Sequence, residues 1–143
     1  MKKILKYFSV ILIVLFCFFL TACDNRIYYW KVAQSVENIS KIEIVEIENG
    51  EIKPAICIIA PEFYEDIIHD VQAIPARKYF GSRTHPKGKS IIIKFNDNTF
   101  DLISKYEPRH ITEPDGDAFS SANWLCYRSD DFNQLIEKWI AKS

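Results

Sequence analysis

The sequence predicts a single small α+β domain in which two helices cover a mainly antiparallel sheet. Two observations lead to this prediction. Strand-like segments rich in isoleucine, valine and phenylalanine come in two pairs, each pair joined by a short turn, and two further segments repeat apolar residues with the period of a helix. The elements follow in the order ββαβββα, so the strands come as two hairpins plus a late strand, which favours an α+β fold over a parallel sheet.

The first hairpin is expected over residues 40–60. Isoleucine and valine nearly alternate with glutamate from Ile42 to Glu48, as in a strand with one buried face. Asn49 and Gly50 then supply the two positive φ angles of a type I′ turn, and the chain returns. Pro54 has no N–H to donate, so the returning strand should lie at an edge of the sheet.

The first helix is expected from Pro61 to about Gln72. Proline suits the first turn of a helix, and a second proline, Pro75, marks the end. The apolar residues of this segment fall on one stripe, which predicts the side that faces the core: Phe63, Tyr64, Ile67, Ile68 and Val71. Residues 76–89 contain glycine, serine and proline and are therefore expected to form a loop.

The second half of the domain follows a similar plan. A strand at 91–95, a turn at 96–99 and a return strand at 100–106 form the second hairpin, followed by a short strand at 110–112, a polar loop at 113–123 and a late strand at 124–128. Ser129 is expected to cap a final helix over residues 130–141. The apolar residues of that helix have the spacing of a core-facing stripe: Phe132, Leu135, Ile136, Trp139 and Ile140.

The first 22 residues form a separate leader. Three lysines, Lys2, Lys3 and Lys6, precede an apolar run from Tyr7 to Leu20. This run has 14 residues, fewer than the ~20 that a helix needs to cross a membrane. A basic start, a short apolar core and small residues at its end indicate an export signal rather than a spanning helix.

The leader ends in Leu20-Thr21-Ala22-Cys23, which resembles the lipobox of bacterial lipoproteins. The resemblance implies cleavage between Ala22 and Cys23, with diacylglycerol on the thiol of Cys23 and palmitate on its new amino group. Two or three acyl chains anchor a protein durably, whereas one chain binds reversibly. The mature chain would then lie on the extracytoplasmic side of the cell membrane, and Asp24 resembles the inner-membrane retention signal of Gram-negative cells. A plain secretory signal or a short buried helix is the alternative.

These features divide the chain into three parts: a signal peptide at 1–22, a lipidated N-terminus with a short lead-in at 23–39, and the α+β domain at 40–143. No glycine-, serine- or proline-rich tether follows Cys23, so the domain should lie close to the membrane. The aromatic segment Ile27-Tyr28-Tyr29-Trp30 either enters the headgroup region or packs into the domain.

Charge and composition exclude several classes of function. Residues 23–143 carry 15 basic and 19 acidic side chains, a net charge of −4. An exported chain of negative net charge is not expected to bind nucleic acid. A chain of this length supports one core rather than two enzymatic domains, and its four glycines offer little means of building a phosphate cradle. No cofactor is expected.

Two cysteines, Cys57 and Cys126, remain in the domain once Cys17 leaves with the leader and Cys23 is lipidated. A disulfide between Cys57 and Cys126 is chemically permitted outside the cytoplasm and would close a long loop. Both residues lie in short apolar runs, so the alternative is two small buried residues of the core.

The sequence contains no motif for catalysis or metal binding. His69, His85 and His110 lack the spacing of metal ligands, and His69 falls on the polar face of the first helix. Ser120 and Ser121 do not lie in a nucleophile elbow. The carboxylates of Glu62, Asp66 and Asp70 are expected to form a solvated face of the first helix. The acidic loop at 113–117 lacks the further oxygens of a calcium-binding loop. We expect no catalytic residue and no metal site.

The most distinctive surface feature is the segment 77–94, which contains no acid although the rest of the domain is acidic. Its basic residues, interleaved with aromatic ones, can contact anionic lipid headgroups, wall polymers or an acidic protein. They are Arg77, Lys78, Arg83, Lys87 and Lys89, followed by Lys94. The alternative is a solvated connecting loop.

The sequence therefore indicates a membrane-anchored lipoprotein that acts as a non-enzymatic binding or interaction protein of the cell envelope, with an envelope protein or an anionic surface as its partner. Two other functions stay open: a structural or stress-related envelope lipoprotein, and a small hydrolase of envelope polymers. An enzyme should show a histidine or carboxylate beside a nucleophile in a cleft, whereas a binding protein should present an exposed apolar or basic patch.

Overall fold

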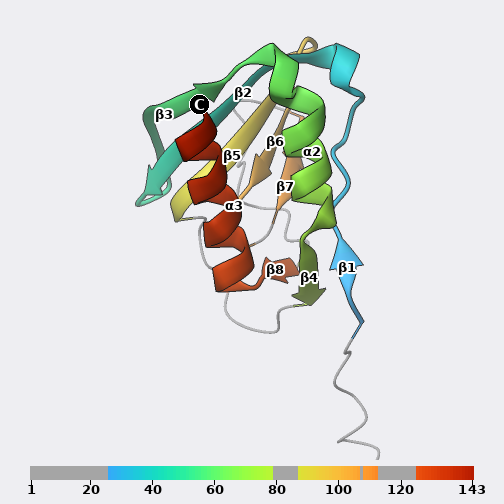
Figure 1. Cartoon of the computed structure of the whole chain (residues 1–143), viewed down its shortest axis with the longest axis vertical. Helices are drawn as coiled ribbons and strands as arrows, with labels where there is room; N and C mark the ends of the chain where they lie inside the picture. The colour runs from blue at the N-terminus through green and yellow to red at the C-terminus, as the bar shows by residue number, and fades with distance from the viewer. Residues whose placement is uncertain (1–25, 79–86, 107, 113–124) are drawn as a thin grey trace, which may run out of the picture.

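The computed structural model describes residues 26–78, 87–106, 108–112 and 125–143. Within these residues it confirms the α+β class, because eight strands form two antiparallel sheets that are accompanied by two helices (Figure 1). We refer to the two sheets as the large sheet and the small sheet.

The large sheet has five strands in the order β3-β2-β5-β6-β7, and each neighbouring pair is antiparallel. The strands are β2 (Ile39–Glu48), β3 (Glu51–Ile59), β5 (Gly88–Phe95), β6 (Phe100–Ile103) and β7 (Arg109–Ile111). Both predicted hairpins are therefore present, as β2–β3 and β5–β6, and they pair with each other through β2 and β5.

The small sheet has three short strands in the order β1-β4-β8. The strands are β1 (Tyr28–Tyr29), β4 (Pro75–Lys78) and β8 (Leu125–Tyr127). The helices are α2 (Tyr64–Ala73), preceded by the 3-10 turn η2 (Pro61–Phe63), and α3 (Ser129–Lys142); a second 3-10 turn, η1 (Val36–Asn38), leads into β2.

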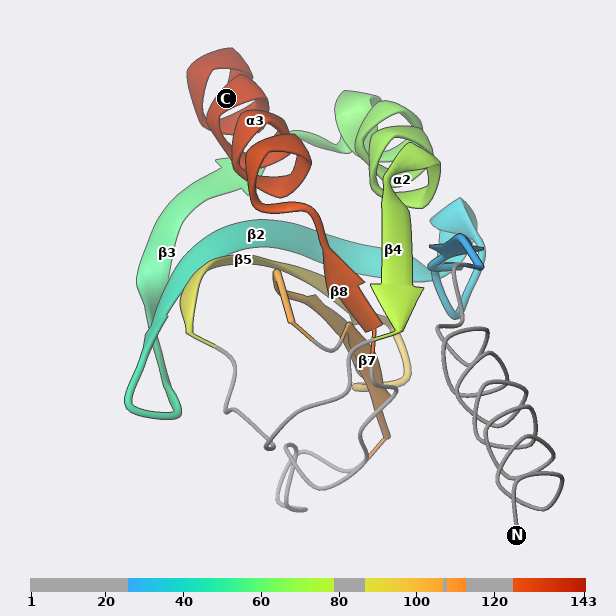
Figure 2. The same cartoon turned by 90° about the horizontal axis from the view of Figure 1, so that it is seen from below.

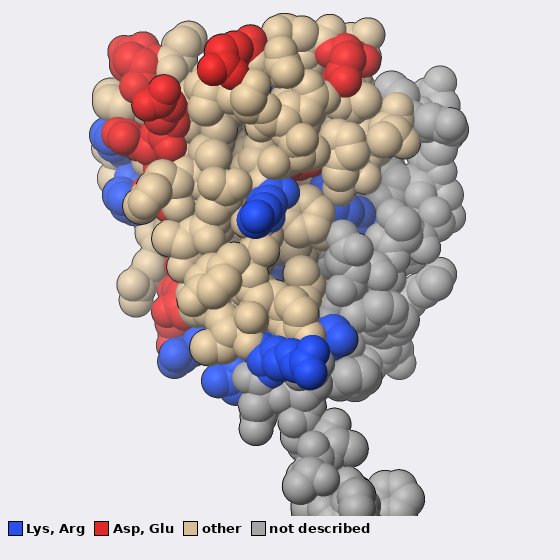
Figure 3. Space-filling model, turned by 90° about the vertical axis from the view of Figure 1, so that its right-hand side faces the viewer, with Lys and Arg blue, Asp and Glu red and all other residues tan. Residues whose placement is uncertain are grey.

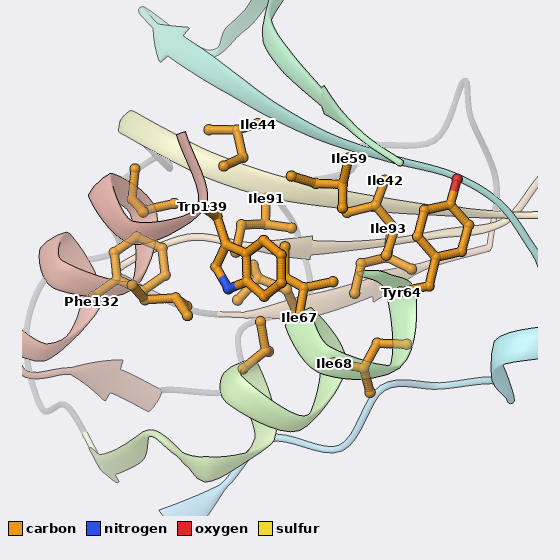
Figure 4. Packing of buried hydrophobic residues seen from close by; sticks show 14 of the residues in the cluster. Ile42, Ile44, Ile59, Tyr64, Ile67, Ile68, Ile91, Ile93, Phe132 and Trp139 are labelled. Carbon is orange, nitrogen blue, oxygen red and sulfur yellow. The ribbon is translucent and has the colours of Figure 1, made fainter. Parts of the chain in front are cut away.

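Both helices cover the same face of the curved large sheet (Figure 2). The predicted apolar stripes of α2 and α3 face this sheet, and their residues belong to one buried cluster with isoleucines of β2, β3 and β5. Figure 4 shows Trp139 of α3 lying between those isoleucines and Ile67 of α2. The side chain of Trp139 is 1% exposed, so this contact is the centre of the core.

The opposite face of the large sheet carries a second, smaller buried cluster. It consists of Val45, Ile47, Ile92, Leu102 and Ile111, with Phe100 packed against it. The three consecutive isoleucines of β5, residues 91–93, are all buried. The strands at the centre of the sheet are therefore covered on both faces, which explains why apolar residues in β5 do not alternate with polar ones.

The turn and edge predictions for the first hairpin are confirmed. Asn49 and Gly50 have φ angles of 53° and 79°, as a type I′ turn requires. Pro54 lies on β3, which is one of the two edge strands of the large sheet. The register between β2 and β3 shifts on both sides of Val45, so β3 is irregular near Pro54.

The small sheet differs from the predicted arrangement in two respects. Residues 75–78 were expected to end a helix and begin a loop, but they form β4, a strand in which Ala76 alone is buried. The late strand β8 pairs with β4 rather than with the large sheet. Strand β4 directly follows α2 and β8 directly precedes α3, so the packing of the two helices brings these strands out at the same end of the domain.

The ends of two other elements also differ from the prediction. Helix α3 begins at Ser129 itself, and its N-cap is Arg128, whose side chain makes no capping hydrogen bond. Strand β6 ends at Ile103 instead of continuing to Tyr106, because Tyr106 turns away to form an isolated bridge with Cys126 of β8.

Polar side chains join the two helices at the rim of the core. The Nζ atom of Lys138 lies 2.6 Å from an oxygen of Asp70, and Trp139 donates its indole N–H to the same carboxylate over 2.9 Å. The Nζ atom of Lys142 lies 3.2 Å from a carboxylate oxygen of Asp66. These two acids, expected to form a solvated face, are partners of α3, and Asp70 satisfies the one polar group that Trp139 buries.

Trp139→Ala should lower the free energy of unfolding by about 3–5 kcal/mol, because it removes the largest buried side chain and leaves a cavity. Urea unfolding monitored by circular dichroism measures the loss. Ile140→Ala, one residue further along α3 and only half-buried, serves as the control and should cost clearly less. Equal losses in the two variants would contradict a core centred on Trp139.

Candidate membrane-facing surface

The described chain begins close to the predicted lipidation site. Ala22 and Cys23, where cleavage and lipidation are predicted, lie outside the described residues, and Arg26 is the first described residue. Three peptide units separate Cys23 from Arg26, so their Cα atoms are at most about 11 Å apart whatever the conformation. Arg26 and the strand that follows it are therefore held near whatever Cys23 is attached to.

Strand alternation divides the aromatic segment that follows Arg26. Tyr28 and Trp30 are half-buried, and Trp30 packs against the core cluster. Ile27 and Tyr29 point outward and are 56% and 57% exposed. The segment thus packs into the domain through one side of β1 and leaves an aliphatic and an aromatic side chain on the other side.

Strand β4 brings basic residues next to this segment. Tyr28 pairs with Ala76 and Tyr29 with Pro75, so the same register continued outward places Arg77 and Lys78 beside the chain that leads into β1. Arg77 and Lys78 are exposed, and the Nζ atom of Lys78 lies 5.3 Å from the ring centre of Tyr28. Two segments about fifty residues apart in sequence therefore meet at one end of the domain.

A backbone hydrogen bond from β8 holds a further lysine, Lys105, at this end. The backbone N–H of Tyr127 donates to the carbonyl oxygen of Lys105 over 3.0 Å, which holds Lys105 beside the small sheet. The Nζ atom of Lys105 lies 4.9 Å from the ring centre of Tyr106. We call the set Arg26, Arg77, Lys78 and Lys105 the basic end. Figure 3 shows lysine and arginine side chains gathered at the lower end of one face of the molecule.

Acidic residues lie at both ends of the domain. Asp130 and Asp131 are in the first turn of α3, directly after β8, and a second group lies at the opposite end. Helix α2 carries Glu65 and Asp66 in its first turn, and Glu62 directly precedes it in η2. The lengths of α2 and β4, which run on in line in Figure 1, put these acids roughly 25 Å from Lys78. This distance is well beyond the Debye length of about 8 Å at physiological salt, so the acids of η2 and α2 hardly weaken the field at the basic end. Asp130 and Asp131 follow β8 closely and offset part of that field.

The other predicted contact residues do not join the basic end. Arg83 lies outside the described residues. Lys87 is exposed and precedes β5, and Lys89 pairs with Glu137 of α3 over 2.6 Å, a hydrogen bond that raises the pKa of Lys89. Of the basic residues predicted in the segment 77–94, the structure therefore places Arg77 and Lys78 at the basic end, next to β1.

Cys57 and Cys126 are free thiols, so the structure does not contain the disulfide that the sequence left open. Cys57 lies on β3 at the edge of the large sheet, whereas Cys126 lies on β8 of the small sheet. Both side chains are half-buried rather than buried, and Cys57 packs against the edge of the core. Burial raises the pKa of the Cys126 thiol.

The structure pairs an aspartate with a histidine that sequence reasoning did not connect. Asp101 of β6 is fully buried, and one of its oxygens lies 2.7 Å from Nδ1 of His110 on β7. Its other carboxylate oxygen accepts the backbone N–H of Ala33 over 2.8 Å. The one signal in the sequence was a lone acid inside the apolar run from Phe100 to Ile103. Because adjacent strands place Asp101 opposite His110, the pairing needed the sheet register.

This Asp–His pair has the geometry of a general base with its orienting carboxylate. No described serine, threonine or cysteine is hydrogen-bonded to His110, and Ser120 and Ser121 lie outside the described residues. Beside the pair, burial raises the pKa of the Tyr127 hydroxyl, and the charge of Asp101 acts in the same direction. What the contacts show is a structural use: Asp101 fixes the backbone of the lead-in at Ala33.

The remaining predicted sites add no further chemistry. His69 is exposed on α2, whereas His85 and the acidic loop at 113–117 lie outside the described residues. In the described part of the chain, no three His, Cys, Asp or Glu side chains are close enough together to hold a metal ion. No described helix is long and apolar enough to span a bilayer. Comparisons with protein-family models, curated proteins and solved structures find no match to this chain.

Asp101→Asn should change how stability depends on pH. Burial raises the pKa of Asp101 in the folded state, although the Ala33 N–H and His110 act against this. A group with a raised folded pKa contributes stability that is present below its unfolded pKa of about 4 and is lost as the pH rises through its folded pKa. The variant keeps an oxygen for Ala33 but does not titrate. Wild type should therefore lose stability relative to the variant as the pH rises above about 4, measured by urea unfolding.

The control is Asp97→Asn in the exposed turn between β5 and β6. The hydroxyl and backbone N–H of Thr99 lower the pKa of Asp97, so its contribution should be lost as the pH falls rather than as it rises. If wild type gained stability over Asp101→Asn with rising pH, the burial argument for Asp101 would be wrong.

Proposed function

We propose that this protein is a lipid-anchored lipoprotein of the bacterial cell envelope that acts by binding, and that its basic end lies against the membrane. The observation that supports the proposal most strongly is the pairing of β1 with β4. It joins the segment that follows Cys23 to the strand that carries Arg77 and Lys78. An anchor at Cys23 would therefore set the basic end, rather than the acidic start of α2, at the bilayer.

The energies of such a contact are sufficient to orient the domain. A basic residue near an anionic membrane surface contributes about 1 kcal/mol, so the four residues of the basic end contribute several kcal/mol at most. The exposed side chains of Ile27 and Tyr29 suit the headgroup boundary, where aromatic rings are favoured. The anchor supplies the attachment, and the basic end supplies the orientation.

Cys23→Ser should release the protein from the membrane. The variant cannot form the thioether to diacylglycerol, so it should lose incorporated palmitate and shift from the membrane to the soluble extracytoplasmic fraction. Cell fractionation with metabolic palmitate labelling measures both effects. Ser35→Ala, which changes an exposed serine elsewhere in the lead-in, is the control. Unchanged palmitate labelling of Cys23→Ser would overturn the proposed anchor.

Arg77→Gln combined with Lys78→Gln should weaken binding of the unlipidated mature chain to anionic vesicles. At about 1 kcal/mol per residue the loss is about tenfold or more. Co-sedimentation with vesicles containing phosphatidylglycerol measures it, and the binding should fall with added salt. Lys53→Gln combined with Lys138→Gln removes the same charge from β3 and α3 and should change binding little. Equal losses in the two double variants would mean that net charge, not the basic end, drives the contact.

A further inference from the structure

Two lysines face each other on the side of the large sheet that is turned away from the helices. Lys41 of β2 is paired directly with Lys94 of β5, and like charges in such cross-strand pairs repel. The carboxylate of Glu43 resolves the repulsion, since one oxygen lies 2.9 Å from Nζ of Lys41 and the other lies 2.5 Å from Nζ of Lys94. We call Lys41 and Lys94 the lysine pair. Together with Glu43 they form a fixed cluster with a net charge of +1.

The lysine pair keeps hydrogen-bonding capacity for a further anion. The side chain of Glu43 is 9% exposed, but those of Lys41 and Lys94 are 39% and 47% exposed. Each ammonium has three N–H groups and gives one to Glu43. Burial alone would raise the pKa of Glu43, but the hydrogen bonds and charges of both lysines outweigh it and hold that pKa below its ordinary value. Glu43 is thus ionised at neutral pH, and donors remain on both lysines.

A mainly apolar groove of about 280 Å³ reaches Glu43 and Lys94, with Lys41 beyond Glu43. Val45, Ile92 and Phe100 line it from the central strands, and Ile52, Pro54 and Ala55 line it from β3, with Lys53 also at its wall. The register shifts in β3 and the small side chain of Ala55 leave this space open. Because a water molecule occupies about 30 Å³ of liquid, the groove has room for about ten heavy atoms.

We propose that this groove binds a small amphiphilic anion: an apolar body of about ten heavy atoms that carries a carboxylate or a phosphate. The apolar body packs against Ile52, Val45 and Phe100, and the anionic group accepts hydrogen bonds from Lys94, with the charge of Lys41 beside it. A cation is disfavoured by the net charge of the lysine pair and Glu43 together, and a neutral polar ligand leaves the apolar lining exposed. The groove is built from β2, β3, β5 and β6, so it is separate from the basic end and does not depend on lipidation of Cys23.

The test uses the mature chain with Cys23→Ser, because every sheet, helix and core contact described above lies within residues 26–143. Octanoate, octyl phosphate and octylammonium are titrated in turn, and backbone amide shifts are followed by NMR. At least one of octanoate and octyl phosphate should give saturable shifts at groove residues. The one that binds more tightly identifies the preferred anionic group. Octylammonium should give no saturable shifts. Absence of saturable shifts with both anions, or equal binding of octylammonium, would overturn the proposal.

Three variants separate the lysine pair from the apolar lining. Lys94→Gln should weaken binding of the anion about tenfold, and Glu43→Gln should strengthen it severalfold because the competing carboxylate is gone. Ala55→Leu should abolish binding by filling the groove, whereas Ala141→Leu, at an exposed position on α3, should leave it unchanged. Circular dichroism shows which variants are folded, and Ala55 is itself exposed, so this variant tests the groove without disturbing the core. Unchanged binding in folded Ala55→Leu would show that the anion binds elsewhere.

Discussion

The packing of α2 against α3 on one face of the large sheet determines where the rest of the chain goes. Trp139 fills the space between the helices and the isoleucines of the sheet, and Asp70 satisfies its indole N–H. Once the helices are side by side, β4 leaves the end of α2 and β8 enters the start of α3 at the same place, so the two strands pair. Strand β1 then has an edge to join. The small sheet, with the basic end on it, is therefore a consequence of the helix packing.

The large sheet is covered differently on its two faces, and its edge strand reflects this. The helices pack on one face. The other face carries the smaller apolar cluster, and its residues Val45, Ile92 and Phe100 also line the groove. Strand β3 exposes Ile52, Ile56 and Ile58, which would favour pairing with another chain. Pro54 and the register shifts interrupt that edge, and they are features that protect edge strands from such pairing. The same irregularity opens the groove, so edge protection and the proposed binding site share one cause.

The sequence predicted the elements whose signal is local and missed those that depend on distant pairing. The stripes of α2 and α3, the Asn49-Gly50 turn and the edge position of Pro54 each follow from a few neighbouring residues, and the structure confirms them. Strand β4 has only four residues and exposes both Arg77 and Lys78, so its composition resembles that of a loop. Its partners β1 and β8 lie about fifty residues away on either side.

The same distinction applies to side chains: Asp101 and His110, or Lys41 and Lys94, become neighbours only when the register of two strands is known.

The lead-in is fixed to the domain at more points than β1, and this gives the proposed anchor a mechanical consequence. The N–H of Val32 donates to the side-chain oxygen of Gln72 over 3.1 Å, and the N–H of Ala33 donates to Asp101 over 2.8 Å. One residue further, the amide of Gln34 donates to Asp97 over 2.7 Å. If the lead-in were joined to the domain only at its C-terminal residue, the domain would turn freely about the anchor. With residues 28–34 held along the domain, this part of the lead-in cannot turn relative to the rest of the domain. Burying the Asp101 carboxylate costs free energy. The hydrogen bond from Ala33 to this carboxylate holds the lead-in against the domain, and the orientation of the basic end depends on that contact.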